Sequence, residues 1–301
     1  MHTILGDKMS IYVQLLLASF FWGSNVIVMK LLLHEIPFLL LATMRVFLSF
    51  VFLGGYLAWK KISFQYDYQK KALIIGILAI YLNFFFTFLG MNEVKGIDNA
   101  FMNALAPILT FVFSILLLKQ KGSQKEYIAI CLTVFAFLLS IRFQIFSIKI
   151  GFWYLFIGML LYMLANVFIQ KWNLHNCLTL SFYELLYGFI FLSIHCYYKG
   201  QLHFEPLLQI SLFHWLLFII ISGIGFAYIQ VIYMKSIGTI GALKTSFFLS
   251  LNPIITYFES LFFLNEKFDW LHFIGFILLA LAIYMIKGQK EKRTTLFHNN
   301  E

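Results

Sequence analysis

The chain has 301 residues, of which 61% are hydrophobic and 12% are charged. Its mean hydropathy is +0.86, and a soluble domain could not bury so much apolar surface, so we expect a protein embedded in a lipid bilayer. The net charge of +9 does not indicate a nucleic-acid partner, because the basic residues lie between apolar segments, where they orient a protein in the membrane.

Ten apolar runs reach or nearly reach the roughly 17–25 residues that a helix needs to cross a bilayer. They lack the strict alternation of barrel strands, so the chain is predicted to be an all-α polytopic membrane protein. The first run follows Lys8 but is too long for a secretory signal and has no Ala-x-Ala site, so we predict an uncleaved span. The predicted spans are residues 11–29, 37–58, 72–91, 97–118, 127–142, 151–170, 177–198, 213–234, 239–263 and 270–286.

Residues 101–121 are echoed by residues 247–267, with eight of 21 positions identical and a proline at the same place in each. The similarity joins the fourth span to the ninth, which indicates an internal repeat of five helices. Because five is odd, the second copy must be inverted in the membrane, as in secondary transporters whose substrate site lies where the halves meet. The predicted organisation is an N-terminal segment (1–10), two five-helix repeats (11–142 and 151–286) and a basic tail (287–301).

The distribution of basic residues predicts the orientation. With the N-terminus in the cytoplasm, most lysines and arginines outside the spans fall on the cytoplasmic side, including Lys60, Lys61, Lys70 and Lys71. The positive-inside rule therefore favours two cytoplasmic termini. The basic tail is expected to be solvated near anionic lipids.

Three ionisable residues lie within predicted spans. Arg45 and Glu184 occupy matching places in the second and seventh spans, and a charge at that depth costs at least ~2.5 kcal/mol, so each should face the protein interior. They are either substrate or proton groups, or they are a structural pair or snorkelling residues near the ends of their spans. Glu259, in the ninth span, has no acidic counterpart in the first half and is the best proton-coupling residue; the alternative is a hydrogen-bonded interhelical carboxyl.

Two prolines mark matching interruptions. Pro107 and Pro253 should kink or break their helices, and Asn103 and Asn252 are placed to satisfy the freed backbone groups. Matching breaks in two halves point to a transporter binding site, although prolines also serve packing alone. Asn25 and Asn166 are related by the repeat and could face each other across a central cavity. The other polar or stacking positions assigned to that cavity are Trp22, Asn83, Tyr162, Tyr228 and Gln230.

The chain resembles the EamA group of the drug/metabolite transporter superfamily over residues 10–287. The resemblance rests on Phe21-Trp22-Gly23-Ser24-Asn25, Arg45, Leu105-Ala106-Pro107, Gly241 through Leu251-Asn252-Pro253, and Leu264-Asn265-Glu266. It implies an inner-membrane carrier, usually an exporter of amino acids or other small metabolites, in which two halves rock around a central cavity. Gln120 departs from the family pattern, since the family often has Glu where the fourth span ends.

Other functions remain as alternatives. An importer or exchanger would have the same sequence features, and a lipid carrier is not distinguished by them. A membrane-embedded enzyme would need a nucleophile or metal constellation, and no His-x-x-x-His, Glu-x-x-His or Gly-x-Ser-x-Gly pattern occurs in the sequence. We therefore expect no catalytic residues, no cofactor and no metal. The expected partners are a small-molecule substrate, protons and the bilayer, with the chain a monomer or weak dimer.

Overall fold

The computed structural model describes residues 10–64, 67–94, 99, 102–140, 142, 149–174, 176–203, 205–265 and 267–286, so most of the predicted N-terminal segment, the tail 287–301 and Glu266 lie outside it. The regular structure of the described residues is helical. In the first half the helices are α1 (Ile11–Leu32), α2 (Phe38–Trp59), α3 (Gln69–Ile75), η1 (Gly76–Leu82), α4 (Asn83–Glu93), α6 (Ala106–Leu118) and α7 (Gln124–Ser140). In the second half they are α8 (Ile150–Lys171), α9 (Cys177–Tyr198), η3 (Glu205–Gln209), α10 (Leu212–Leu217), η4 (Phe218–Ile224), α11 (Gly225–Ile240), α12 (Ala242–Leu249), α13 (Asn252–Phe263) and α14 (Trp270–Ile286).

Six continuous helices of the described chain are long and apolar enough to cross a membrane. Four are α1, α2, α8 and α9, and two are composite: α3, η1 and α4 form one helix, and α10, η4 and α11 form another. The second composite helix has 29 residues and ends at Ile240, so the predicted span 213–234 was too short. The hydrophobic run alone did not show its ends, because polar residues such as Lys235 and Ser236 continue the helix.

Both composite helices contain a π-helical segment at the same place. η1 and η4 each have seven residues and are separated by 142 positions, in the third helix of each half. π-helical turns are rare and are frequently found at functional sites. Their matching positions are a structural sign of the repeat that the sequence echo predicted.

The predicted spans 97–118 and 239–263 are not continuous helices. A turn at Ala104–Leu105 precedes α6, and a turn at Ser250–Leu251 separates α12 from α13. Each proline lies in the first turn of the following helix, where the backbone N–H that it lacks would have no helical partner. The prolines therefore favour a helix start at these points.

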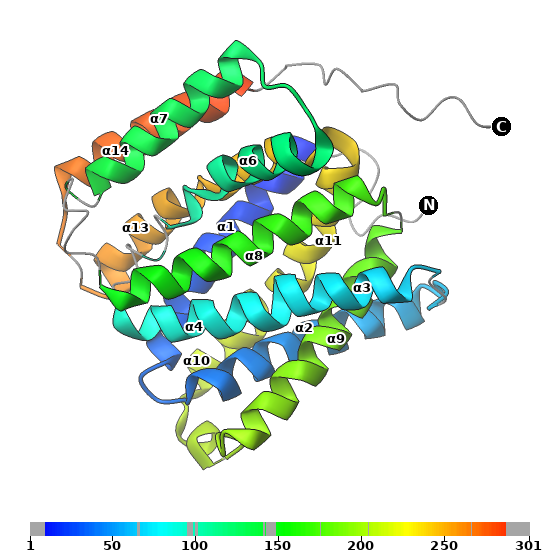
Figure 1. The fold of residues 1–301 in the computed structure, drawn as a ribbon. Coiled ribbons are helices and arrows are strands. Elements are labelled where there is room, and N and C mark those ends of the chain that lie inside the picture. Colours follow the sequence, from blue (N-terminus) through cyan, green and yellow to red (C-terminus); the bar gives the residue numbers. More distant parts are fainter. Residues whose placement is uncertain are drawn as a thin grey trace.

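The helix pairs in Figure 1 obey a two-fold relation between the halves. α4 packs on α8 as α11 packs on α1, η1 packs on α9 as η4 packs on α2, and α6 packs on α8 as α13 packs on α1. The pairs α2–α9 and α7–α14 each join equivalent helices. Exchanging the halves therefore leaves these helix pairs unchanged, as expected for inverted repeats with an odd number of helices.

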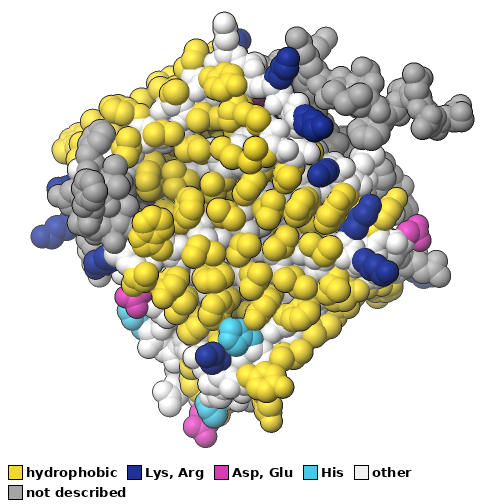
Figure 2. All heavy atoms as spheres, viewed as in Figure 1, with side chains coloured by type: hydrophobic (Ala, Val, Ile, Leu, Met, Phe, Trp, Pro, Cys, Tyr) yellow, Lys and Arg dark blue, Asp and Glu magenta, His cyan; other side chains and the backbone are white. Residues whose placement is uncertain are grey.

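The outer surface is apolar. Figure 2 shows a continuous field of hydrophobic side chains over one face of the molecule. Large apolar residues are exposed on many helices, among them Phe20, Val51, Leu116, Ile194 and Phe262. In water such a surface would cause aggregation, whereas in a bilayer it faces lipid.

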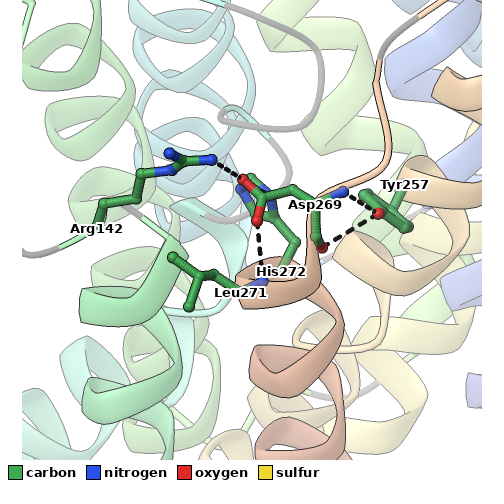
Figure 3. Close-up of polar contacts among 5 residues, drawn as sticks. All are labelled: Arg142, Tyr257, Asp269, Leu271 and His272. Carbon is green, nitrogen blue, oxygen red and sulfur yellow. Dashed lines mark hydrogen bonds and ion pairs between the residues drawn. The ribbon is translucent and has the colours of Figure 1, made fainter.

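A polar network fixes one end of the α7–α14 pair (Figure 3). Arg142, just after α7, donates from Nη2 to Asp269 Oδ2 at 2.5 Å, and Asp269 Oδ1 accepts from the backbone N–H of Leu271 in the first turn of α14. The hydroxyl of Tyr257 in α13 accepts a hydrogen bond from the N–H of Asp269 at 2.8 Å. Asp269 thereby links α7, α13 and α14.

Candidate functional site

Arg45 is buried in α2, with 6% of its surface exposed. Its guanidinium carbon lies 4.6 Å from the ring centre of Phe84 and 4.1 Å from that of Phe226. These rings come from opposite halves, directly after η1 and η4, and contact each other with centroids 5.3 Å apart. Desolvated cation–π contacts are worth about 2 kcal/mol or more each, so the paired rings hold the charge in place.

Glu184 is buried in α9, with 1% of its surface exposed. Its Oε1 accepts a hydrogen bond from Nε2 of Gln230 in α11 at 3.0 Å. Within the described residues no ion pair joins Glu184 to Arg45. The two repeat-related charges therefore do not neutralise each other directly in this conformation, and each has its own set of neighbours.

An aromatic wall lies beside these charges. The ring of Trp22 in α1 lies 5.5 Å from those of Tyr162 in α8 and Tyr233 in α11, and 6.4 Å from that of Phe226. Tyr162 is close enough to Arg45, Glu184 and Asn166 to interact with all three. The wall thus connects the two charged residues.

Four buried polar atoms around this wall have no hydrogen-bond partner among the described residues: Arg45 Nε, Glu184 Oε2, Gln230 Oε1 and Tyr233 OH. We call these four residues the central cluster. A buried polar atom left unpaired costs about 1–3 kcal/mol, and such atoms in a native structure commonly await a ligand, water or ion. The central cluster presents donors on Arg45 and Tyr233 and acceptors on Glu184 and Gln230.

Several predicted cavity residues instead hold helices together. Asn25 Nδ2 donates to Ser222 Oγ in η4 at 2.9 Å, so this amide joins α1 to η4 and does not face Asn166 as expected. The side chain of Asn166 lies beside that of Tyr162. Asn83 Nδ2 donates to the carbonyl of Gly158 at 2.8 Å, which joins α4 to α8. Tyr228 donates its hydroxyl hydrogen to the carbonyl of Gln14 at 3.3 Å.

The helix break before α13 is buried and polar. Asn252 is fully buried, and neither the oxygen nor the nitrogen of its side-chain amide has a hydrogen-bond partner among the described residues. The buried Ser250 hydroxyl also has no hydrogen-bond partner among them. The expectation that Asn252 would satisfy the freed backbone groups is therefore wrong for this conformation. Asn103 is also buried, with 6% exposed, just before α6.

Glu259 lies on the face of α13 that contacts α1. Ser24 donates its hydroxyl hydrogen to Glu259 Oε1 at 2.6 Å, and one turn earlier Thr256 Oγ1 donates to the carbonyl of Gly23 at 3.0 Å. Glu259 is only partly buried. It belongs to the α1–α13 contact and not to the central cluster.

No group of three or more His, Cys, Asp or Glu side chains in the described part of the chain is arranged to hold a metal ion.

The sequence profile of the EamA-like transporter family matches residues 9–142 and again residues 149–288. The chain belongs to the EamA-like transporter family. This membership makes the chain a multi-pass membrane transporter of a small-molecule substrate and not an enzyme.

A crystal structure of a protein 12% identical in sequence matches the EamA-like chain with a TM-score of 0.70, over 93% of this chain and 97% of its own length. At that identity the match shows the shared fold alone. No curated protein sequence matches the chain.

Sequence reasoning missed three aromatic residues of this EamA-like transporter: Phe84, Phe226 and Tyr233. A signal for the first two was present, because Phe84 and Phe226 are separated by the same 142 positions as η1 and η4. In a chain with 37 phenylalanines that coincidence is weak until the packing is known. Gln230 and Tyr162 were predicted as cavity residues, and both lie beside the buried charges.

Proposed function

We propose that the chain is a secondary carrier of small zwitterionic metabolites, α-amino acids among them, and that it works as an exporter in the bacterial inner membrane by alternating access. The observation that supports this proposal is the central cluster. Its two opposite charges are buried, come from equivalent helices of the two halves, and retain unpaired polar atoms.

A zwitterion matches those atoms. A substrate carboxylate would accept hydrogen bonds from the Arg45 guanidinium and the Tyr233 hydroxyl. A substrate ammonium would donate to Glu184 Oε2 and Gln230 Oε1. Because each buried charge is costly when uncompensated, a ligand that carries both opposite charges is favoured over one that carries a single charge and leaves the other group unpaired.

The conformation described is closed around this site. All four residues of the central cluster are at most 6% exposed, so a substrate can enter or leave only when helices move. The contacts of α2 with η4 and of α9 with η1 join the two halves beside the cluster. Rocking of the halves about these contacts would expose the cluster to one side of the membrane at a time.

We assign proton coupling to Glu259. Its carboxylate is partly exposed and has one short hydrogen bond from Ser24, so protonation and deprotonation would change how firmly α13 is held against α1. Glu259→Gln should abolish acceleration by a pH gradient and keep substrate exchange. Unchanged pH dependence in this variant would reject the assignment.

The test is counterflow in proteoliposomes made with the purified full chain. Vesicles are preloaded with an α-amino acid mixture, and uptake is compared for a labelled amino acid, its decarboxylated amine and its deaminated acid. The proposal predicts preloading-dependent uptake of the zwitterion only. Equal uptake of the amine or the acid would refute the pairing of both charges with substrate.

Two variants sharpen the assignment. Arg45→Met and Glu184→Gln should each reduce zwitterion counterflow at least tenfold, because each removes one complementary charge. The control is Tyr228→Phe, which loses one peripheral hydrogen bond and should transport normally. Asn83→Asp would not serve as a control, because Asn83 donates its amide hydrogen to a carbonyl. If both charge variants transport like Tyr228→Phe while folded, the site assignment is wrong.

We also propose that both termini are cytoplasmic and that the carrier works as a monomer or weak dimer. Single cysteines in place of Lys70 and Lys199, at opposite ends of the helices, test the orientation. Labelling from outside should reach position 199 and not position 70, and the reverse result would invert the topology. The direction of transport follows from the substrate and proton gradients, so the same binding site would serve an importer or an exchanger.

A further inference from the structure

A group of lysines and aromatic rings lies where α3 begins and α8 ends, two helices that pack together although they belong to different halves. Lys71 Nζ lies 4.9 Å from the ring centre of Tyr68 and 5.9 Å from that of Trp172. Lys171 is the neighbour of Trp172 in sequence, and Lys70 precedes Lys71 in the first turn of α3. We call Lys70, Lys71 and Lys171 the lysine patch.

No lysine of the patch forms an ion pair among the described residues. Among the described residues the ion pairs all involve Asp269, at the end of the α7–α14 pair, and none involves these lysines. Lys70 and Lys171 are exposed, and Lys71 is partly exposed. The carboxylate nearest to them in sequence is that of Asp67, and it forms no ion pair with any of the three lysines.

The surroundings of the lysine patch are those of a membrane interface. Tyr68 and Trp172 are residue types that concentrate at the level of lipid headgroups, and the Trp172 ring stacks on Phe168 with centroids 4.8 Å apart. Figure 2 shows basic side chains arranged along one edge of the hydrophobic field, so their ammonium groups border the surface that faces acyl chains.

We propose that the lysine patch binds the headgroup phosphate of an anionic phospholipid, whose acyl chains lie on the adjoining apolar surface. Phosphate oxygens accept hydrogen bonds from ammonium groups and neutralise them. A phosphatidylglycerol headgroup brings a net negative charge, whereas phosphatidylcholine carries its own cation and cannot compensate three lysines. Because the patch spans both halves, the bound lipid stabilises the conformation in which the ends of α3 and α8 are close.

The experiment is native mass spectrometry of the detergent-solubilised full chain titrated with phosphatidylglycerol or phosphatidylcholine, with thermal unfolding measured in parallel. The wild-type chain should retain phosphatidylglycerol preferentially and be stabilised by it. Each lysine near an anionic surface contributes about fivefold in affinity, so Lys71→Glu/Lys171→Glu should weaken phosphatidylglycerol binding at least about 20-fold.

The matched control is Lys149→Glu/Lys199→Glu, which reverses two exposed charges at the opposite ends of α8 and α9. It should keep wild-type binding. If the patch variant fails to fold, the milder Lys71→Gln/Lys171→Gln is measured and should still lose preference for phosphatidylglycerol. Unchanged binding in the patch variants, or an equal loss in the control pair, would overturn the proposal. Equal stabilisation by inorganic phosphate alone would overturn the choice of a lipid as the occupant.

Discussion

Gly188 in α9 provides a quantitative test of how closely the halves meet. A Cβ atom built at Gly188 would lie 2.2 Å from Cγ2 and 2.5 Å from Cβ of Ile80 in η1. Ile80 is fully buried, and its β-branched side chain has little rotamer freedom in a helix. The Gly188→Ala variant can therefore fold only if the two helices move apart.

The matched control is Gly55→Ala, since a Cβ at Gly55 in α2 meets no atom within 4 Å. Both changes gain the same helix propensity, about 0.5–1 kcal/mol, so that contribution cancels when the two variants are compared. The remaining difference is the cost of overpacking, about 1–3 kcal/mol. Gly188→Ala should be less stable than Gly55→Ala by that amount.

The measurement is reversible unfolding in mixed micelles with increasing denaturing detergent, on the wild-type chain and both variants. Adding Ile80→Ala to Gly188→Ala should restore only part of the stability, because the Cβ of residue 80 remains 2.5 Å from the new methyl group. Counterflow should also fall in Gly188→Ala, since Glu184 lies one turn away on α9. Equal stability of the two single variants would refute the close packing of α9 on η1.

Three further predictions concern other contacts. Ser24→Ala removes the 2.6 Å hydrogen bond to Glu259 and should shift the pH dependence of transport measured in proteoliposomes. An unshifted pH profile would show that Ser24 has no role in proton coupling. Asn252→Leu replaces an unpaired buried amide; stability measured in detergent should not fall, while lost stability would show that the amide is satisfied in the folded protein. Asp269→Asn should destabilise the chain near neutral pH. Burial opposes ionisation of Asp269, but hydrogen bonds from Arg142 and the Leu271 N–H outweigh it and lower its pKa. The carboxylate therefore stabilises the fold above its unfolded pKa of about 3.9, and this contribution is lost as the pH falls through the lower folded pKa. The thermal stabilities of wild type and variant should converge in acid. A stability difference that stays constant with pH would contradict a lowered pKa for Asp269.

The helical class and the repeat could be predicted because apolar run length and the echo around Pro107 and Pro253 are local features of the sequence. The helix ends and breaks were less accessible. The run 239–263 is mostly apolar, and the break before α13 depends on where Pro253 can begin a new helix. The π-helical segments have no local sign, since the sequences of η1 and η4 are ordinary apolar helix formers and a small residue or two.

The site was predicted in its residue types better than in its contacts. A buried charge must have neighbours that stabilise it, so depth alone singled out Arg45 and Glu184. Which neighbours they have is a property of packing between distant helices: the aromatic rings over Arg45 come from two composite helices, and Gln230 reaches Glu184 across 46 positions. Asn25 shows the opposite case, because its amide is used by Ser222 in η4 and is not available to a substrate in this conformation.

The repeat also explains why the two ends of the proposed site differ in charge. Backbone packing is two-fold related, and so are the phenylalanines over Arg45, yet the equivalent positions 45 and 184 have opposite charges. Perfect symmetry would give two like charges, which repel each other. Opposite charges on a symmetric scaffold give one end that binds an anion and one that binds a cation. Under the proposed function, a zwitterion would be held in a single orientation, while the scaffold around it, which is nearly the same from both sides, would open to either side of the membrane.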